Sequence, residues 1–301
     1  KSLKHNILEK SDEKIWFVNN KVIKFFKNGK IAKNRVKRSL SLKNYIPKIL
    51  AKKNNLYSYQ YCNGEIFSNI DNINIFKNLL DYIWKFHNSK KKNLSKKFQL
   101  KCLKFYKHKT EERLKLFYRR FNVIDEESKI NNVKIPKLKL ILDMIDWKHI
   151  SKGIICNFHG DLHFENILYS RKSKSFKFLD WRQDFQGEIF YGDAYYDYAK
   201  LMHGLLVSHE MVRKNKYKIK WNKYNIFFSI KSKNIYKQYL NYFILWLEQK
   251  KIDVRKVNII TGLIYLNIAP LHHYPYSLFL YAIGKKMVFE NINYEKKKIY
   301  N

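Results

Sequence analysis

Residues 156–185, CNFHGDLHFENILYSRKSKSFKFLDWRQDF, constrain the fold more than any other stretch of the sequence. Asp161 follows His-Gly in a predicted tight loop, because glycine permits backbone geometry that other residues resist. Asn166 comes shortly afterwards, just before an apolar run that predicts a strand. A basic turn and a second apolar run then lead to Asp180. We therefore expect a β-hairpin that returns Asp180 to the side of Asn166.

Acidic residues are scarce, since the chain has 61 Lys and Arg against 25 Asp and Glu. Scarce carboxylates at regular spacing suggest a chemical task. One free carboxylate beside an Asn/Asp pair suits Mg²⁺, which takes a few protein oxygens and leaves the rest to phosphate and water. Phosphoryl transfer needs this set, because a carboxylate orients the attacking hydroxyl while metal ions neutralise the developing charge.

The composition predicts a globular protein of one large or two smaller domains, with 301 residues of which 46% are hydrophobic. No apolar run is long enough to span a bilayer, and no secretory segment is present. Cys62, Cys102 and Cys156 are far apart and form no CxxC pair, which favours reduced thiols in the cytoplasm. The first residue is Lys, which leaves room for an upstream domain.

The net charge of +36 raises the question of nucleic-acid binding. The basic residues are spread evenly over the chain together with Asn, Ile, Tyr and Phe, and no helix-turn-helix, zinc finger or RRM signature is present. We therefore expect no specific nucleic-acid binding. A basic surface would still favour an anionic substrate or an acidic partner.

The first 65 residues predict strands with one helix among them. IWFVNNKVIKFF reads as a hairpin that turns at Asn19-Asn20, and a second hairpin turns at Asn54-Asn55. Residues 29–42 show helical spacing. We expect residues 1–65 to form a small N-lobe with a five-stranded antiparallel sheet.

The remainder, residues 66–301, predicts a larger helical C-lobe. Helical patterns cover the region after Ile70, then 98–121 and 136–150, and nearly everything after residue 192. The expected whole is a bilobal α+β fold.

Three segments carry a resemblance to a known family: HGDLHFENIL (159–168), FLDW (178–181) and YGDAYYDYAKLMH (191–203). They resemble the aminoglycoside phosphotransferase/choline kinase family of small-molecule kinases. The string DWRQDF…YGDAYYDYAKL is most similar to its bacterial branch linked to capsule or lipopolysaccharide biosynthesis. The resemblance implies a protein-kinase-like form of this bilobal α+β fold, with ATP and Mg²⁺ in a cleft between the two lobes. It also implies transfer of the γ-phosphate to a small-molecule hydroxyl.

The resemblance also implies roles for individual residues. Asp161 matches the catalytic base, and Asn166 and Asp180 match the metal ligands. His159 would support the catalytic loop. Asp197 matches an acid that ties the loop backbone to a helix start, although an ordinary acid at a helix N-terminus would look the same.

In the N-lobe, the family pattern implies that Lys24 of KVIKFF meets the inner phosphates of the nucleotide, with Lys21 as the rival. Backbone groups near Tyr61 and Cys62 of YQYCNG match the hinge that pairs with adenine. The turn EKSDEK (9–14) has no glycine, so backbone amides and Ser11 would have to hold the phosphates.

The sequence departs from the family at the helix that follows Lys24. Kinases of this fold usually pair the strand lysine with a helix glutamate, yet residues 27–64 contain no acid. Either Glu65 or Glu111 substitutes, or Lys24 is held by phosphate and Asp180 alone.

Other classes of protein fit less well. A protein kinase needs an activation segment, but only sixteen residues separate Asp180 from Asp197 and no A-P-E follows. A zinc hydrolase is suggested by His159-x-x-x-His163, but no Glu follows the first His. A pseudokinase or nucleotide-binding scaffold stays open because of the missing helix acid.

The acceptor is the least determined part. Aminoglycosides are polycations and would be bound by an acidic patch, for which the candidates are Asp184, Glu188 and Asp193. Choline or ethanolamine wants an aromatic cage, for which the candidates are Tyr191, Tyr195, Tyr196, Trp181 and Trp221. A sugar or sugar phosphate wants hydrogen-bonding groups, for which the candidates are Arg182, Gln183, His203 and His209.

As candidate substrate residues we take Arg182, Gln183, Asp184 and His203. The DWRQDF string favours a surface-glycan precursor, either a sugar or a choline/ethanolamine-type compound. Residues 266–276 are expected along the far wall of the site. His272 and His273 in that segment are expected to be ordinary surface or core-edge residues.

Overall fold

The structure, a computed structural model, describes residues 12–88 and 95–292. Its N-terminal part is an antiparallel sheet with the strand order β1-β2-β4-β3. Asn19 and Asn20 have φ of 44° and 60° between the first two strands, and Asn54 has φ of 47° between the last two. Asparagine tolerates this left-handed region, which confirms both predicted hairpins. The strands are β1 (Glu13–Val18), β2 (Lys21–Phe26), β3 (Ile49–Lys53) and β4 (Leu56–Gln60).

The expectation of five strands in this sheet is corrected to four within the described residues. The next strand, β5 (Glu65–Ile66), leaves the sheet and pairs instead with β9 (Ile167–Ser170). Together with β10 (Ser175–Phe178) these form a three-stranded sheet that contains the predicted hairpin. The division of the chain at residue 65 stays a prediction.

Helix α1 (Gly29–Leu42) lies against the N-terminal sheet, where it contacts β2, β3 and β4. Its first turn is capped by Asn28, whose side chain accepts a hydrogen bond from the backbone N–H of Lys30. Its buried face includes two arginines, Arg35 and Arg38. Because buried cations require partners, this face indicates contacts with polar groups beyond the sheet.

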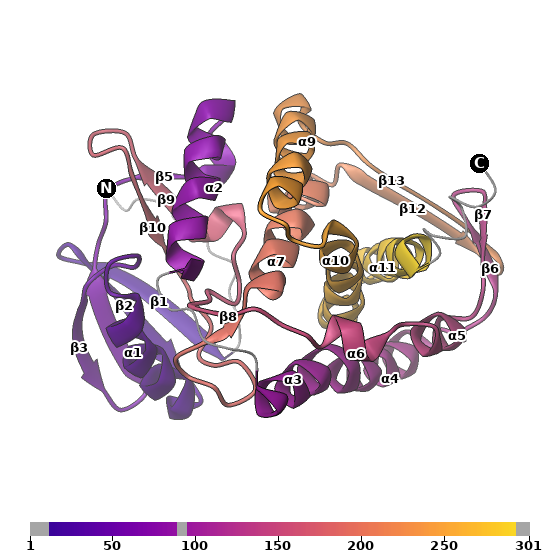
Figure 1. Cartoon of the computed structure of the whole chain (residues 1–301), viewed down its shortest axis with the longest axis horizontal. Coiled ribbons are helices and arrows are strands. Elements are labelled where there is room, and N and C mark those ends of the chain that lie inside the picture. The colour runs from indigo at the N-terminus through magenta and orange to yellow at the C-terminus, as the bar shows by residue number, and fades with distance from the viewer. Residues whose placement is uncertain (1–11, 89–94, 293–301) are drawn as a thin grey trace.

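The larger part of the chain is helical and lies to one side of the sheet (Figure 1). Helix α10 is central, since it packs against α4, α7, α9 and α11. Its glycine at position 262 allows close approach to α11, because an added Cβ would lie 2.7 Å from Val288. The long helices are α2 (Ile73–Asn88), α3 (Lys96–Leu103), α4 (Lys109–Phe121), α7 (Ala194–Leu206), α9 (Asn234–Gln249), α10 (Val254–Ile268) and α11 (Tyr276–Ile292).

Shorter elements connect the long helices. Helices α3 and α4 are joined without a break by a π-helical segment, Lys104–His108. The 3-10 segments are Phe67–Asn69, Phe164–Asn166 and Ala269–Leu271. The remaining short elements are α5 (Leu138–Asp143), α6 (Trp147–Ile150), β8 (Ile155–Cys156), β11 (Gly192–Asp193) and α8 (His209–Arg213).

The expectation of helix almost throughout the region after residue 192 is wrong for residues 217–230. Strands β12 (Tyr217–Asn222) and β13 (Asn225–Ile230) form a hairpin there. With β6 (Ser128–Ile130) and β7 (Val133–Ile135) they form a second four-stranded sheet, at the far end of the molecule from β1–β4 (Figure 1). Tyr217, Ile219 and Trp221 alternate with exposed residues, which is the period of a strand rather than of a helix.

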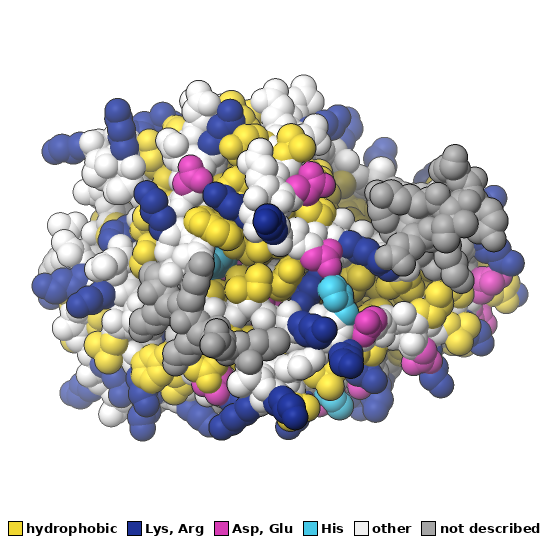
Figure 2. Space-filling view, viewed as in Figure 1, with side chains coloured by type: hydrophobic (Ala, Val, Ile, Leu, Met, Phe, Trp, Pro, Cys, Tyr) yellow, Lys and Arg dark blue, Asp and Glu magenta, His cyan; other side chains and the backbone are white. Residues whose placement is uncertain are grey.

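The surface carries many basic side chains and few acidic ones, and Figure 2 shows the basic ones dispersed over one whole face rather than gathered in one patch. None of the helices in residues 12–88 and 95–292 has the length and hydropathy to cross a membrane.

Candidate active site

The loop that carries Asp161 is shaped by Gly160, which has φ of +86°. A Cβ added there would lie 2.6 Å from the Cβ of Arg182 and 2.8 Å from the ring of Phe158. Neither the backbone conformation nor the space permits a larger residue. The predicted tight loop is therefore present.

Asp197 fastens this loop from helix α7. Its carboxylate is fully buried and accepts hydrogen bonds from the backbone N–H groups of His159 and Gly160, at 2.6 and 2.7 Å. The ring Nε2 of His87 lies 3.1 Å from the same carboxylate. Hydrogen bonds to a buried charge are strong, so Asp197 fixes the start of the loop. The sequence allowed two roles for Asp197, and these contacts correspond to the one in which it ties the loop backbone to the start of helix α7.

His159 joins the loop to the end of the β9–β10 hairpin. Its Nε2 donates to the carbonyl of Leu179 at 2.7 Å, and its Nδ1 accepts from the N–H of Asp161 at 3.1 Å. Burial is the main reason why its pKa falls to about 4, so the ring is neutral near pH 7. Because both ring nitrogens engage backbone groups, His159 has no lone pair for the zinc site considered from His159-x-x-x-His163.

Asp161 projects from the loop with its side chain 37% exposed. Nζ of Lys200 on α7 lies 2.8 Å from its Oδ1, and Nε2 of His163 lies 3.5 Å from its Oδ2. Burial would raise the pKa of Asp161, but Lys200 and His163 outweigh it and hold the pKa well below its usual value. Asp161 is therefore ionised, and it can accept a hydrogen bond from a hydroxyl.

Asn166 is oriented by the same loop. Its side-chain Nδ2 donates to the backbone carbonyl of Asp161 at 2.8 Å, and the backbone carbonyl of Asn166 accepts from the backbone N–H of Leu179 at 2.8 Å. Within the described residues its Oδ1 accepts no hydrogen bond. The second bond brings the end of the hairpin, and with it Asp180, back to Asn166. An unengaged amide oxygen and a carboxylate are hard oxygen donors of the kind that Mg²⁺ prefers.

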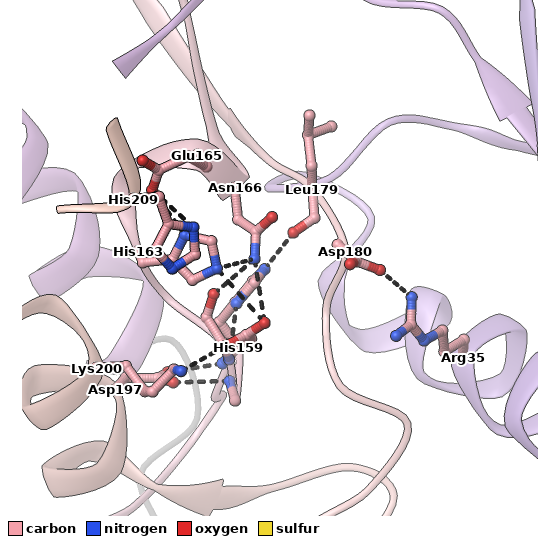
Figure 3. Close-up of polar contacts among 12 residues, drawn as sticks. Arg35, His159, His163, Glu165, Asn166, Leu179, Asp180, Asp197, Lys200 and His209 are labelled. Atoms are coloured by element: carbon pink, nitrogen blue, oxygen red, sulfur yellow. Dashed lines mark hydrogen bonds and ion pairs between the residues drawn. The ribbon is translucent and has the colours of Figure 1, made fainter. Parts of the chain in front are cut away.

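Asp180 is held from the N-terminal sheet and from α1. Its Oδ1 lies 2.7 Å from Nζ of Lys24 and forms an ion pair with Arg35 (Figure 3 shows the second contact). Nζ of Lys24 also lies 2.9 Å from Glu13. Burial would lower the pKa of Lys24, but Asp180 outweighs it, so the pKa is raised and the lysine is charged.

These contacts show which groups surround Lys24 in the absence of an acid in residues 27–64. Glu13 on β1 is a carboxylate partner of Lys24, and α1 contributes Arg35 instead of an acid. Glu65 pairs with Arg171, and Glu111 lies near His108, so neither takes the place considered for it. Lys24 is 3% exposed, whereas its rival Lys21 is exposed.

Sequence reasoning missed Glu13, Arg35 and Lys200. A signal for Glu13 was present, because the hairpin turn at Asn19-Asn20 pairs Ile15 with Lys24. Side chains two residues apart on a strand share a face, so Glu13 comes diagonally to Lys24. Arg35 and Lys200 had no comparable signal in a chain so rich in basic residues.

The predicted hinge lies directly after β4. The N–H of Tyr61 donates to the carbonyl of Asn20 at 2.9 Å, which closes the sheet. No described residue engages the backbone N–H or C=O of Cys62, whose side chain is half-buried. Ser11 lies outside the described residues.

A cavity of about 300 Å³ opens beside Asp161. Of the candidate substrate residues, Arg182 and Gln183 line it, whereas Asp184 and His203 do not. Of the five aromatic candidates only Tyr196 lines it. The lining comprises Arg35, Phe105, Tyr106, Lys109, Arg113, Gly160, Asp161, Asp180, Arg182, Gln183, Tyr196, Lys200, Ile260, Leu263, Ile264, Asn267, Ile268 and Leu271.

The far wall comes from α10 and the segment after it. Asn267, Ile268 and Leu271 lie within the predicted segment 266–276 and line the cavity, whereas His272 and His273 do not. The acids considered for an aminoglycoside site lie elsewhere: Glu188 pairs with Lys101, and Asp193 is fully buried.

Comparison of the whole structure with solved structures identifies the fold. Aminoglycoside phosphotransferase APH(2'')-Ib, ADP-bound, superposes with a TM-score of 0.53 at 14% identity, over 95% of this chain and 92% of that chain. A choline/ethanolamine kinase family protein from Mesorhizobium loti gives 0.51 at 12% identity, over 95% and 89%. A putative fructosamine-3-kinase from Thermobifida fusca gives 0.53 at 10% identity, over 90% and 85%.

No protein family profile matches the sequence, and no curated protein matches it at a significant level. At identities this low the three likenesses establish the fold alone. The chain has the bilobal protein-kinase-like fold of the aminoglycoside phosphotransferase and choline kinase structures, as the sequence predicted.

Proposed function

We propose that the protein is a small-molecule kinase that transfers the γ-phosphate of ATP to a hydroxyl group. One observation carries the proposal: three separate segments bring Asp161, Asn166 and Asp180 together around the end of one hairpin, and Lys24 of the N-terminal sheet bonds to Asp180 at 2.7 Å. This set provides a carboxylate for the acceptor, oxygen donors for a metal and a cation for the nucleotide phosphates. The fold supports the same proposal.

Each residue has a defined task in the proposed reaction. The bond between the γ-phosphorus and the β–γ bridging oxygen breaks, a new bond forms from the acceptor oxygen to phosphorus, and ADP leaves. Asp161 accepts a hydrogen bond from the acceptor hydroxyl and orients its oxygen. The hydroxyl proton passes through Asp161 to water. Lys200 and the bonds of Asn166 to the loop fix the position of Asp161.

Mg²⁺ fits the donor set of Asn166 and Asp180, because the amide oxygen has no partner among the described residues and the carboxylate is 21% exposed. The ion would neutralise charge on the transferring phosphoryl group. Lys24 and Arg35, which pair with Asp180 in this structure, would be the cations available to the nucleotide phosphates beside it. We assign the adenine to the backbone of Cys62 at the hinge.

The acceptor class follows less directly. The sequence favours a precursor of surface polysaccharide, either a sugar or a choline/ethanolamine-type compound, with aminoglycosides as the alternative. Arg182 and Gln183 in the cavity wall support a sugar. ATP use and the free thiols of Cys62, Cys102 and Cys156 favour the cytoplasm.

The test is thermal unfolding with ATP and Mg²⁺, followed by measurement of ADP release with a panel of sugars, sugar phosphates, choline, ethanolamine and aminoglycosides. A ligand that binds only the native state raises its stability by mass action. We expect a magnesium-dependent rise in Tm and turnover with one acceptor class. Asp161→Asn should lower turnover by about 10²–10⁴-fold while nucleotide binding persists, and turnover at the native rate would refute the mechanism.

A second candidate function is a nucleotide-binding pseudokinase. The observation that favours it is Arg35, because α1 presents a cation where kinases of this fold present a glutamate to the strand lysine. A Tm rise with ATP and Mg²⁺ but no turnover on any acceptor class would favour this function.

A further inference from the structure

The cavity beside Asp161 has more basic than acidic side chains in its wall. Five cations line it, namely Arg35, Lys109, Arg113, Arg182 and Lys200, against two carboxylates, Asp161 and Asp180. A site built for a cationic acceptor would show the opposite balance, because like charges that face each other across an interface repel.

The two carboxylates are already neutralised by protein cations. Lys200 pairs with Asp161, and Arg35 pairs with Asp180. The other three cations, Lys109, Arg113 and Arg182, have no carboxylate within ion-pair distance in the described part of the chain. The uncompensated charge therefore lies on the side of the cavity formed by α4 and the segment after β10.

Partial burial makes this charge costly. Burial is the largest reason why the pKa of Lys109 falls to about 7, and the cations Arg182, Arg113 and Lys200 lower it further, against Asp161, which raises it. The Nε of Arg182 is buried and has no hydrogen-bond partner among the described residues. Buried cations and donors of this kind are satisfied when an anion binds.

The backbone directs these cations into the cavity. Lys109 is the first residue of α4 and directly follows the π-helical segment, and Arg113 lies one turn further on the same face. A π-helical turn inserts one extra residue and so changes the direction in which the next helix faces; such turns are frequent at functional sites.

Of the three aromatic residues in the lining, Phe105, Tyr106 and Tyr196, Phe105 is already in contact with two protein cations. Nζ of Lys109 lies 4.5 Å from the ring centre of Phe105, and the guanidinium carbon of Arg182 lies 5.1 Å from it. A quaternary ammonium seeks such a ring, but here it would meet two cations. Trp181, a candidate for an aromatic cage, is fully buried, and its Nε1 donates to the carbonyl of Arg35.

The wall formed by α10, which adjoins α4, offers a hydrogen-bond acceptor. Asn267 of α10 donates through Nδ2 to Thr110 and to the carbonyl of Leu263, at 2.8 and 2.6 Å. Its Oδ1 is buried and has no partner among the described residues. A hydroxyl group of a polyol would satisfy this oxygen.

We propose, on the basis of the phosphotransferase function above, that the acceptor is an anionic polyol whose carboxylate or phosphate is bound by Lys109, Arg113 and Arg182. Its reacting hydroxyl faces Asp161, and a further hydroxyl donates to Asn267. Sugar acids and sugar phosphates have this chemistry. Choline, ethanolamine and aminoglycosides have the opposite charge, so under this proposal they bind less well than an anionic polyol.

The first experiment compares four compounds that share one ring: glucose, glucuronate, glucose 6-phosphate and glucosamine. ADP release is measured for each with ATP and Mg²⁺. We expect the kcat/KM of glucuronate or glucose 6-phosphate to exceed that of glucose by at least about tenfold, because the charge is bound in a largely desolvated site. Preference for glucuronate identifies a carboxylate and preference for glucose 6-phosphate a phosphate. Preference for glucosamine overturns the inference but leaves phosphotransfer intact.

The second experiment needs no turnover. Thermal unfolding is measured with inorganic phosphate or glucuronate against chloride at equal ionic strength, with a non-hydrolysable ATP analogue and Mg²⁺ saturating the nucleotide site. We expect the anions to raise Tm for the native protein and for Lys115→Met, whose lysine is exposed on α4 and does not line the cavity. Lys109→Met and Arg113→Met should lose this rise.

The two proposals fail in different ways. Absence of the anion-dependent rise in the native protein, or its persistence in both cavity variants, overturns the anionic acceptor. Absence of any nucleotide-dependent rise overturns the kinase function, and the anion series is then read without nucleotide. If none of the four compounds reacts, the anion series alone decides the acceptor charge.

Discussion

The catalytic loop and the α4 wall face the same cavity, yet their charges are organised in opposite ways. On the loop side each acid has partners within the protein: Asp161 has Lys200, Asp180 has Lys24 and Arg35, and Asp197 has two backbone amides. On the α4 side Lys109 and Arg113 have no acidic partner among the described residues. The charges on the loop side are therefore paired before any ligand binds, whereas those on the α4 side are paired only when a ligand binds.

The largest effect is expected from a substitution of Asp161, on the loop side of the cavity. Asp161→Asn should lower kcat by about 10²–10⁴-fold, because the variant cannot take the hydroxyl proton. The affinity for ATP should change little. Single-turnover kinetics and nucleotide titration measure the two effects. Asp143→Asn, an exposed acid on α5, is the control, and equal losses in both variants would contradict the assignment.

The next effect concerns Asp197, which holds the loop but does not line the cavity. Asp197→Asn keeps the shape and removes the buried charge that accepts from His159 and Gly160. We expect the free energy of unfolding to fall by about 2–4 kcal/mol, because two charge-assisted hydrogen bonds are weakened. Urea denaturation measures the change. An unchanged midpoint would mean that the loop is held by other contacts.

A smaller effect is expected in the pH dependence of KM, which tests Lys109 on the α4 side of the cavity. Lys109 binds an anion only when it is charged, and its pKa of about 7 in the free protein places the loss of charge near neutrality. It is surrounded by Arg182, Arg113, Lys200 and Asp161. The KM for glucuronate should therefore rise about tenfold between pH 6 and pH 8, as the charged fraction of Lys109 falls. Lys109→Met should have a high KM that does not vary over this range. A native KM independent of pH would show that Lys109 does not contact the acceptor.

The smallest effect is expected at the hinge segment after β4, where the Kd of ATP should hardly depend on the Cys62 side chain. Cys62 also has backbone groups without partners among the described residues, and the proposed contact with adenine uses the backbone alone. Cys62→Ala should therefore change the Kd of ATP by less than about twofold, or less than about 0.4 kcal/mol. Calorimetric titration measures this. A larger change would mean that the thiol side chain itself contacts the nucleotide.

The sequence predicted the β9–β10 hairpin and the return of Asp180 to the side of Asn166, because the geometry there is local. The distance from Asn166 to Asp180 along the chain fits one hairpin, and Gly160 marks the tight loop. The same holds for the two hairpins that turn at asparagine pairs in the N-terminal sheet. The sheet at the far end was missed, since β13 pairs with β6 across about a hundred residues, and short-range patterns do not report such pairing.

The cavity beside Asp161 could not be predicted for a different reason. Lys109 and Arg113 belong to one helical pattern and Lys200 to another, in a chain with 61 basic residues, so none of them stands out in the sequence. What distinguishes them is the packing of α4, α7 and α10 around one space. Glu13 could have been found from hairpin register, whereas Arg35 required knowledge of how α1 lies against Asp180.

Helix α1 has one further consequence for movement. Arg38 is completely buried, donates to the carbonyls of Phe158 and Arg182, and lies over the ring of Phe158. These bonds cross from the N-terminal part of the chain to the segments on both sides of the catalytic loop. Helix α1 is therefore fixed to the larger lobe by hydrogen bonds as well as to the sheet by packing. A shift of strands β1–β4 relative to α1 would leave these hydrogen bonds, and with them the backbone around Asp161, unchanged.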